Sequence, residues 1–247
     1  MRIVCEQMGK YYESIICISD LQIPFHHQDA FIFIEAIKKR FWINSSKSLC
    51  INQGDEVDQH KLGKYITSPD TMSAGMEYTA SLMYLKQLWD LFPEQKVCIS
   101  NHTWRIFNKA MAAGIPRAFL REISDFMNAP KGVEWRHKWQ YNGVIFEHGE
   151  NVSGPNAALN AAIQNGMSTS IGHQHVYGGV THISRAAGPI WGMNTGCLID
   201  VNQYAFDYAK KARKKPTLGM GVILDGVPYF IPMILNSRGR WIKKLSI

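Results

Sequence analysis

The 247-residue sequence predicts an α/β fold, a four-layer sandwich of two mixed β-sheets flanked by helices. Two observations lead to this prediction. The first half of the chain alternates short apolar runs with longer stretches of helical periodicity, which is typical of βαβ units in a largely parallel sheet. The second half is rich in short strand-like runs and has one helical interruption. We expect residues 1–247 to form a single domain, because no linker-like segment divides them.

Three apolar runs predict buried strands in the first half, at Ser14–Ser19, Ser48–Gln53 and Lys96–Ser100. Helices are expected at Asp29–Arg40, where Phe33, Ala36 and Ile37 share one face, at Ser73–Leu91, and within Ala118–Met127. In the second helix the apolar residues at helical spacing are Met76, Ala80, Met83, Tyr84, Leu88 and Leu91.

Six further runs predict the strands of the second half: Gly143–Glu147, Ser168–Gly172, Gly178–Ser184, Ile190–Thr195, Gly219–Asp225 and Val227–Ile234. The last two flank Asp225-Gly226, a pair that suits the tight primed turn of a hairpin. One helix is expected near Pro155–Gln164. A strand-rich half that follows a parallel half favours two sheets packed face to face, with the helices outside.

The composition excludes several classes of protein. A hydrophobic content of 46% is ample for a core, so the chain is not expected to be disordered. No apolar run approaches the ~20 residues that span a bilayer, and the N-terminus does not resemble a secretory signal. The five cysteines include no CxxC pair, and Cys17, Cys50 and Cys98 lie in apolar runs as buried hydrophobes. We expect a cytoplasmic protein that has no membrane partner.

A net charge of +7 favours anionic partners. The positive charge is concentrated in two clusters, Lys210–Lys215 and the group Arg238, Arg240, Lys243 and Lys244 beside Trp241. Each cluster has two interpretations, a solvated surface or a groove that neutralises a nucleic-acid backbone. Charge alone does not choose between them.

Polar blocks follow five of the predicted strands, at the carboxyl ends where open α/β sheets place their sites. These blocks are Asp20-Leu21-Gln22, Gly54-Asp55-Glu56-Val57-Asp58, Asn101-His102, His148-Gly149 and Gly172-His173-Gln174-His175. Each block alone also fits a turn, a helix cap or a structural histidine. Their conjunction favours a metal site, because Asp, Asn and His together suit divalent ions such as Mn²⁺, Fe²⁺ or Zn²⁺.

The five blocks resemble the calcineurin-like metallophosphoesterase superfamily, whose pattern is DxH, GDxxD, GNH(D/E), (V/I)xxxHG and GHxH. The resemblance runs from Asp20 to His175 and is to a compact, cap-less member with a DxQ variant of the first motif. It implies that Asp55 bridges two metals. It further implies that the first metal takes Asp20 and His175, and that the second takes Asn101, His148 and His173. By the same resemblance, His102 contacts the scissile phosphate and stabilises or protonates the leaving oxygen, with Asp58 as its orienting partner.

The sequence departs from the family pattern at several positions. Gln22 stands where the family has His, and its carbonyl oxygen is a weaker ligand that prefers harder ions. His26 and His27 in the same loop are alternatives as ligands, substrate contacts or surface residues. Ser100 replaces a Gly, and Thr103 replaces the acidic residue after His102. Gln59 stands where serine/threonine phosphatases carry an arginine, and Arg105 is a candidate phosphate ligand.

We therefore predict a dinuclear metal-dependent phosphoesterase that hydrolyses a phosphodiester, of nucleotide or nucleic-acid type, by a metal-bridging hydroxide. Two divalent ions are expected, Mn²⁺ first, with Fe, Zn, Mg or Ni as alternatives. Three other functions stay open: a phosphomonoesterase or protein phosphatase, a nuclease that works with a partner, and a non-catalytic binding module with a weakened first metal site.

Overall fold

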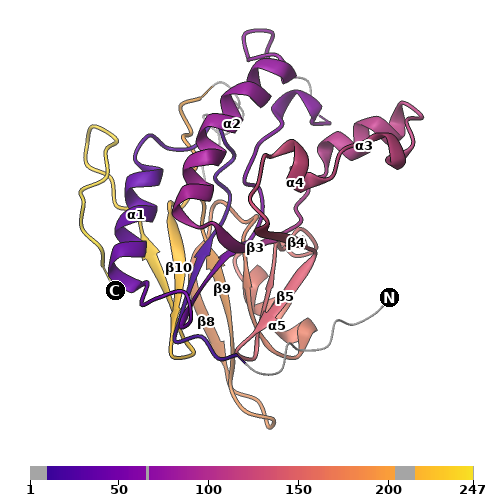
Figure 1. The fold of residues 1–247 in the computed structure, drawn as a ribbon. Helices are drawn as coiled ribbons and strands as arrows, with labels where there is room; N and C mark the ends of the chain where they lie inside the picture. Colours follow the sequence, from indigo (N-terminus) through magenta and orange to yellow (C-terminus); the bar gives the residue numbers. More distant parts are fainter. Residues whose placement is uncertain (1–9, 65–66, 204–214, 247) are drawn as a thin grey trace.

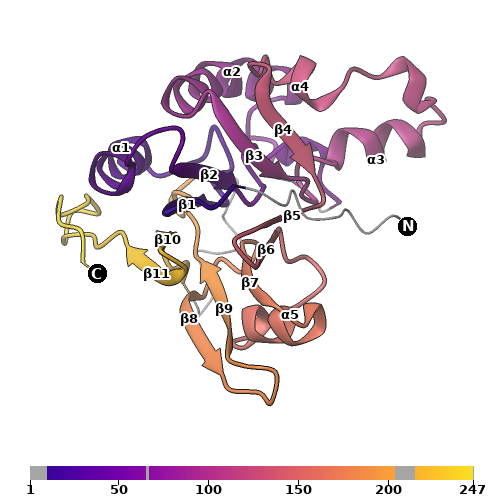
Figure 2. The same cartoon turned by 60° about the horizontal axis from the view of Figure 1, so that its bottom comes forward.

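A computed structural model of the protein describes residues 10–64, 67–203 and 215–246. Two β-sheets are stacked in the middle of the molecule, and helices cover both outer faces (Figures 1 and 2). The predicted α/β sandwich of two mixed sheets flanked by helices is thereby confirmed. None of the helices in the described ranges combines the length and apolar character that a bilayer crossing requires.

The first sheet has six strands in the order β11-β10-β1-β2-β3-β4. The strands are β1 (Ser14–Ile18), β2 (Ser48–Asn52), β3 (Glu94–Cys98), β4 (Gly132–Arg136), β10 (Gly219–Leu224) and β11 (Val227–Pro232). Strands β1 to β4 run parallel, whereas β10 is antiparallel to β1 and β11 is antiparallel to β10. Asp225 and Gly226 join β10 to β11 with φ of 46° and 81°, as the predicted primed turn requires.

The second sheet has five strands in the order β5-β6-β7-β9-β8. They are β5 (Lys138–Tyr141), β6 (Val144–Glu147), β7 (Ser168–Ile171), β8 (Gly178–Ile183) and β9 (Ile190–Thr195). The three central strands β6, β7 and β9 run parallel, and each edge strand is antiparallel to its neighbour. The carboxyl ends of β6 and β7 therefore lie at one edge of this sheet.

The helices are α1 (Ala30–Phe41), α2 (Ala74–Leu91), α3 (Arg105–Ala112), α4 (Ile123–Phe126) and α5 (Ala157–Asn165), with 3₁₀ turns η1 (His60–Leu62) and η2 (Arg117–Phe119). Figure 2 shows α1, α2 and α4 over the first sheet and α5 over the second. Ser73 caps α2, because its hydroxyl accepts the N–H of Met76 at 3.2 Å. Gly166 ends α5 with φ of 67°, the left-handed conformation that suits glycine.

The alternating side chains of β1 separate two cores. Ile15 and Cys17 face the second sheet, where they pack with rings such as Trp139 and Phe146. Ile16 and Ile18 belong instead to the core beneath α1 and α2. Burial in both directions explains why the strand is apolar along its whole length. Cys17, Cys50 and Cys98 are buried, as predicted.

The buried face of α2 differs from the prediction. Met76 and Met83 are 63% and 58% exposed, while the buried residues are Glu77, Ser81, Leu85, Leu88 and Trp89. The buried face lies about one residue further along the helix than predicted. Polar contacts account for this difference, because Ser81 Oγ lies 3.3 Å from the Ile23 carbonyl oxygen and Glu77 accepts the His60 N–H at 2.8 Å.

Other elements also differ from the prediction. Strand β3 ends at Cys98 rather than Ser100, and the predicted helix over Ala118–Met127 is only a 3₁₀ turn followed by the one-turn α4. The elements α3, β4 and β5 were not predicted. Strands β4 and β5 carry charged residues on a half-exposed edge, which hides their strand character.

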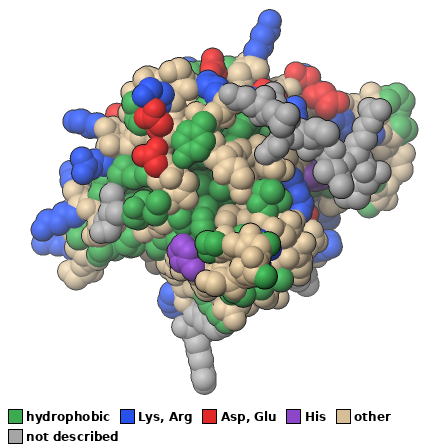
Figure 3. All heavy atoms as spheres, turned by 90° about the horizontal axis from the view of Figure 1, so that it is seen from below, with side chains coloured by type: hydrophobic (Ala, Val, Ile, Leu, Met, Phe, Trp, Pro, Cys, Tyr) green, Lys and Arg blue, Asp and Glu red, His purple; other side chains and the backbone are tan. Residues whose placement is uncertain are grey.

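The C-terminal segment packs along α1. Trp241 is buried edge-to-face against Phe33, and Arg240 pairs with Asp29 at the start of the helix. Figure 3 shows Lys and Arg side chains that project at the left, the side on which Figure 1 places α1 and the C-terminal segment. Arg238, Lys243 and Lys244 are exposed there. Of the predicted Lys210–Lys215 cluster, Lys215 alone falls within the described residues.

Candidate metal centre

The five polar blocks follow five parallel strands. Asp20 lies two residues beyond β1, Asp55 three beyond β2 and Asn101 three beyond β3. His148 directly follows β6, and His173 lies two residues beyond β7. Both sheets therefore contribute side chains to one cluster, at the edge where their parallel strands end.

The first group of possible metal ligands contains Asp20, Asp55 and His175, whose ligand atoms lie within 4.8 Å of one another. His175 Nε2 is 2.9 Å from Asp20 Oδ1. The other oxygen of Asp20 accepts the backbone N–H of His173 at 2.8 Å and the hydroxyl of Ser19. These contacts fix the orientation of a carboxylate that is fully buried.

The second group contains Asp55, His148 and His173. His148 Nε2 lies 3.4 Å from Asp55 Oδ1 and 2.9 Å from Asn101 Oδ1, and His173 Nδ1 lies 3.1 Å from the same nitrogen. The other ring nitrogen, His148 Nδ1, faces the carbonyl oxygen of Gln53 at 2.8 Å. A carbonyl only accepts, so Nδ1 carries the proton and Nε2 offers its lone pair to the cluster.

Gln22 reaches the first group. Its Nε2 donates to Asp55 Oδ2 at 3.3 Å and lies 3.2 Å from His175 Nε2. The amide oxygen is buried and has no hydrogen-bond partner. Since an amide can be turned to exchange its oxygen and nitrogen, the unpaired oxygen can face the same two residues. An orphaned acceptor at this position fits a bound cation.

The charges of the cluster also fit a metal. Burial alone would raise the pKa of Asp55, but His102, His148 and the Ser100 hydroxyl hold it well below its usual range. Burial would lower the pKa of His148 and His175, yet the Asp55 and Asp20 carboxylates raise both. His173 differs, because burial and the neighbouring His148 lower its pKa. Two carboxylates among imidazoles form the mixed oxygen and nitrogen set that divalent ions prefer.

His102 lies beside the two groups. Its Nδ1 is 2.7 Å from Asp58 Oδ1, and its Nε2 is 3.7 Å from Asp55 Oδ2. Arg105 Nη2 donates to His102 Nε2 at 2.8 Å, and Arg105 Nη1 donates to the carbonyl oxygen and Oδ1 of Asp58. A guanidinium never accepts, so Nε2 is the acceptor and the ring proton sits on Nδ1, facing Asp58.

A buried network supports these residues, and sequence reasoning missed it. Ser100 Oγ accepts the Asp55 N–H at 2.9 Å and lies 2.9 Å from Thr103 Oγ1. Thr103 donates to Glu56, which also accepts from Trp135 Nε1. Burial raises the pKa of Glu56. Thr103 therefore faces inward, and the available signal was the Ser-x-x-Thr spacing, which resembles a local side-chain cap.

The backbone of the cluster adopts the left-handed region at four non-glycine residues. The φ angles are 51° at Asp20, 47° at Gln22, 52° at Asp55 and 64° at His173. Such residues cost about 1–3 kcal/mol each and concentrate at functional sites. The backbone is also closely packed here. Gly172 allows the close approach to Ser19 and Asp20, because a Cβ there would lie 1.8 Å from Ser19 Oγ and 2.7 Å from Asp20 Oδ2.

A cavity of about 730 Å³ opens beside this cluster. Asn101 and Arg105 are among the residues that line it. The exposed Lys64, Lys109 and Glu150 lie around it, so cations outnumber anions on its walls. An anionic group in this cavity would be close to His102.

Neither of the alternative histidines is placed as a ligand. His27 is buried, with Nε2 facing the Gly239 carbonyl oxygen and Nδ1 accepting the Asp29 N–H. His26 packs edge-to-face on Phe31 and Tyr84, and burial lowers its pKa to about 4. His27 is a packed structural residue, so the surface interpretation is wrong for it, whereas His26 is partly exposed.

Comparisons with known proteins give little beyond this geometry. No protein-family model matches the chain, and no curated protein matches it. Among solved structures, one described as that of "a putative diadenosine tetraphosphatase" aligns over 89% of this chain and 93% of its own, with 11% identity and a TM-score of 0.44.

Proposed function

We propose that the protein is a metal-dependent phosphoesterase that hydrolyses a phosphodiester of nucleotide or nucleic-acid type. The observation that supports this most is the pair of ligand groups that share the buried Asp55. His102, oriented by Asp58, lies beside that shared carboxylate. Carboxylates common to two ligand groups are typical of sites that clamp a phosphoryl group between two ions.

Each side chain has a defined task in this proposal. Asp20, His175 and Gln22 would hold one divalent ion, and His148, His173 and Asn101 the other, with Asp55 between them. Bound ions would supply Lewis acidity, which lowers the pKa of a water and neutralises charge on the phosphoryl group. We keep Mn²⁺ as the first choice, because the set combines carboxylate, amide and imidazole ligands.

His102 and Arg105 would meet the substrate from the opposite side. While Arg105 donates to His102 Nε2, this nitrogen is an acceptor and has no proton to offer to a leaving oxygen. His102 can protonate that oxygen only after it takes up a second proton and releases Arg105. In the present arrangement its first task is to position the phosphoryl group, and Asp58 keeps the ring oriented for it.

A diester is favoured over a monoester by the position of Arg105. Its Nη1 donates to Asp58 and its Nη2 to His102. A guanidinium held in this way is not free for the bidentate grip that a terminal phosphoryl dianion attracts. The more weakly charged diester does not require such a grip.

The test is hydrolysis of a chromogenic phosphodiester and of the matching monoester, with and without Mn²⁺. We expect Mn²⁺-dependent turnover that favours the diester. Asp55→Asn and His148→Ala should each reduce kcat by about 10²-fold or more, while circular dichroism shows an intact fold.

The matched controls are Asp70→Asn and His182→Ala, because both residues are exposed and lie outside the two ligand groups. Both control variants should retain full turnover. Undiminished activity in Asp55→Asn would contradict the proposal, and turnover of the monoester alone would move the substrate class to phosphomonoesters.

A further inference from the structure

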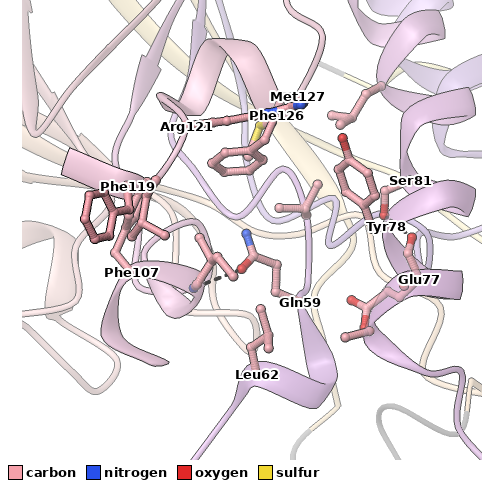
Figure 4. Close-up of a pocket in the computed structure, with 16 residues that line it drawn as sticks. Gln59, Leu62, Glu77, Tyr78, Ser81, Phe107, Phe119, Arg121, Phe126 and Met127 are labelled. Carbon is pink, nitrogen blue, oxygen red and sulfur yellow. Dashed lines mark hydrogen bonds between the residues drawn. The ribbon is translucent and has the colours of Figure 1, made fainter. Parts of the chain in front are cut away.

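A second cavity, of about 530 Å³, lies between α2, α3 and α4 (Figure 4). Its volume is typical of small-molecule sites. Aromatic rings line it from several elements: Tyr78 of α2, Phe107 of α3, Phe119 of η2 and Phe126 of α4. Phe119 is 79% exposed, so a large apolar ring stands at this cavity in contact with solvent. These walls suit a flat, apolar group.

Two polar groups enter this aromatic cavity. Gln59 Oε1 accepts the backbone N–H of Ile106 at 3.2 Å, which leaves its Nε2 pointing into the cavity below Phe126 (Figure 4). Glu77 lies on the opposite wall and is 3% exposed. Burial raises the pKa of Glu77 to about 7, so near neutral pH its carboxyl group can accept or donate. A purely aliphatic ligand would leave Gln59 Nε2 without a partner, whereas Glu77 already accepts the His60 N–H.

The aromatic cavity adjoins the candidate metal centre. Gln59 directly follows Asp58, and Ile106 directly follows Arg105, so the cavity wall continues from the residues around His102. Leu62 lines both this cavity and the basic cavity that contains Asn101 and Arg105. A single molecule could therefore place an anionic group near His102 and a ring beyond Leu62.

We propose that the aromatic cavity binds the heteroaromatic base of the substrate, so that the protein selects nucleoside phosphodiesters. This inference rests on the proposed phosphoesterase function. The base stacks among Tyr78, Phe107 and Phe126, and Gln59 Nε2 donates to an acceptor on its edge. Stacking on aromatic side chains tolerates any base, and the hydrogen-bonding edge distinguishes a base from an aliphatic chain.

The test compares three 4-nitrophenyl phosphodiesters that release the same phenolate, with thymidine 5′-, hexyl or methyl as the second ester group. We expect kcat/KM of the wild-type protein to favour the thymidine ester over the methyl ester by roughly 10- to 100-fold, as burial of a ring predicts. The hexyl ester should fall between the two.

Two variants address the cavity itself. Gly75 lines it, and a Cβ added there meets nothing within 4 Å, so Gly75→Phe is designed to place a ring in the space that a base would occupy. We expect Gly75→Phe to bring the thymidine-to-methyl ratio close to one and Gln59→Leu to bring the thymidine-to-hexyl ratio close to one. Met83→Phe is the matched control, since Met83 is exposed on α2 outside the cavity lining. Melting temperatures check that each variant is folded.

The outcomes separate the two proposals. Turnover with equal kcat/KM for all three esters, or a preference for the hexyl ester, would overturn the base-binding inference and leave the phosphoesterase proposal standing. Absence of turnover for every ester would instead count against the phosphoesterase proposal. In that case, ligand-observed NMR with thymidine decides the inference: binding that Gly75→Phe abolishes supports a base site, and absence of binding overturns it.

Discussion

Gln22 makes the two ligand groups unequal at the scale of single residues. The second group contains two imidazoles besides Asp55, whereas the first has His175 alone. The amide of Gln22 lies between Asp55 Oδ2 and His175 Nε2, at 3.3 Å and 3.2 Å. A neutral amide oxygen is a weaker ligand than imidazole for Mn²⁺, Zn²⁺ or Ni²⁺. The first metal should therefore be held less tightly than it would be with a histidine in place of Gln22.

Gln22→His should tighten Mn²⁺ binding at one site by about tenfold or more and leave the other site unchanged, because an imidazole replaces the amide among the same neighbours. Isothermal titration calorimetry measures both sites. Gln164→His is the matched control, since Gln164 is exposed on α5. Unchanged affinity at both sites would rule out Gln22 as a ligand.

The residue types of the site could be predicted from the sequence, because each polar block directly follows a strand. The ligand and catalytic roles of these residues stay predictions. Glu56, Ser100 and Thr103 could not be found in this way, since their function comes from hydrogen bonds that exist only when β2 and β3 lie side by side. The position of Arg105 against Asp58 likewise depends on tertiary contacts.

At the scale of elements, α5 packs directly on β9. A Cβ on Gly192 would lie 2.2 Å from the backbone carbon of Ala158 and 2.3 Å from its oxygen. Small residues on α5 and β9 allow this close approach. The helix thereby covers the second sheet beside β7, the strand that leads to His173. The missing side chain of Gly192 is therefore a packing requirement.

Gly192→Ala should destabilise the protein by roughly 1–3 kcal/mol or more, because the backbone of α5 must move. Gly75→Ala is the comparison, since its Cβ meets open space and a glycine-to-alanine change there should stabilise by about 0.4–1 kcal/mol. Urea denaturation of the two variants measures both effects. Equal stability of the two variants would contradict the packing account.

Elements with strong periodicity could be predicted, and those defined by polar contacts could not. Strand β9 was predicted at Ile190–Thr195, the bounds it has in the structure. On α2 the periodicity was right at Leu88, which is buried, and wrong at Met76 and Met83, which are exposed. Periodicity counts only apolar residues, whereas Glu77 and Ser81 are buried here with hydrogen bonds of their own. The one-turn α4 is too short for a helical pattern to define it.

At the scale of the whole molecule, Asp29 connects the start of α1 to the C-terminal segment. Its carboxylate accepts from Arg240 Nε at 2.8 Å and from the Trp241 N–H at 2.9 Å. The Arg240 contact holds the pKa of Asp29 at about 2, below its ordinary value of 3.8. Arg240 therefore stabilises the packing of the C-terminal segment on α1. The sequence alone placed it in a basic cluster, for which a nucleic-acid groove was one interpretation.

Asp29→Asn should lower stability at neutral pH, and the difference from wild type should shrink in acid. Because the folded-state pKa is depressed, the contribution of Asp29 is complete above about pH 4 and is lost as pH falls toward about 2. Thermal unfolding of both proteins from pH 7 to pH 2 measures the difference. A difference that stays constant down to pH 2 would contradict the pairing.

In the proposed dinuclear centre, Asp55 is a ligand common to two metal sites. A calorimetric Mn²⁺ titration of the metal-free protein and its variants tests this proposal most directly. We expect two sites in the wild type, one in His148→Ala, one in His175→Ala, and loss of tight binding at both in Asp55→Asn. The His182→Ala control should keep two sites. Two undisturbed sites in Asp55→Asn, or none in the wild type, would contradict the account of a dinuclear centre.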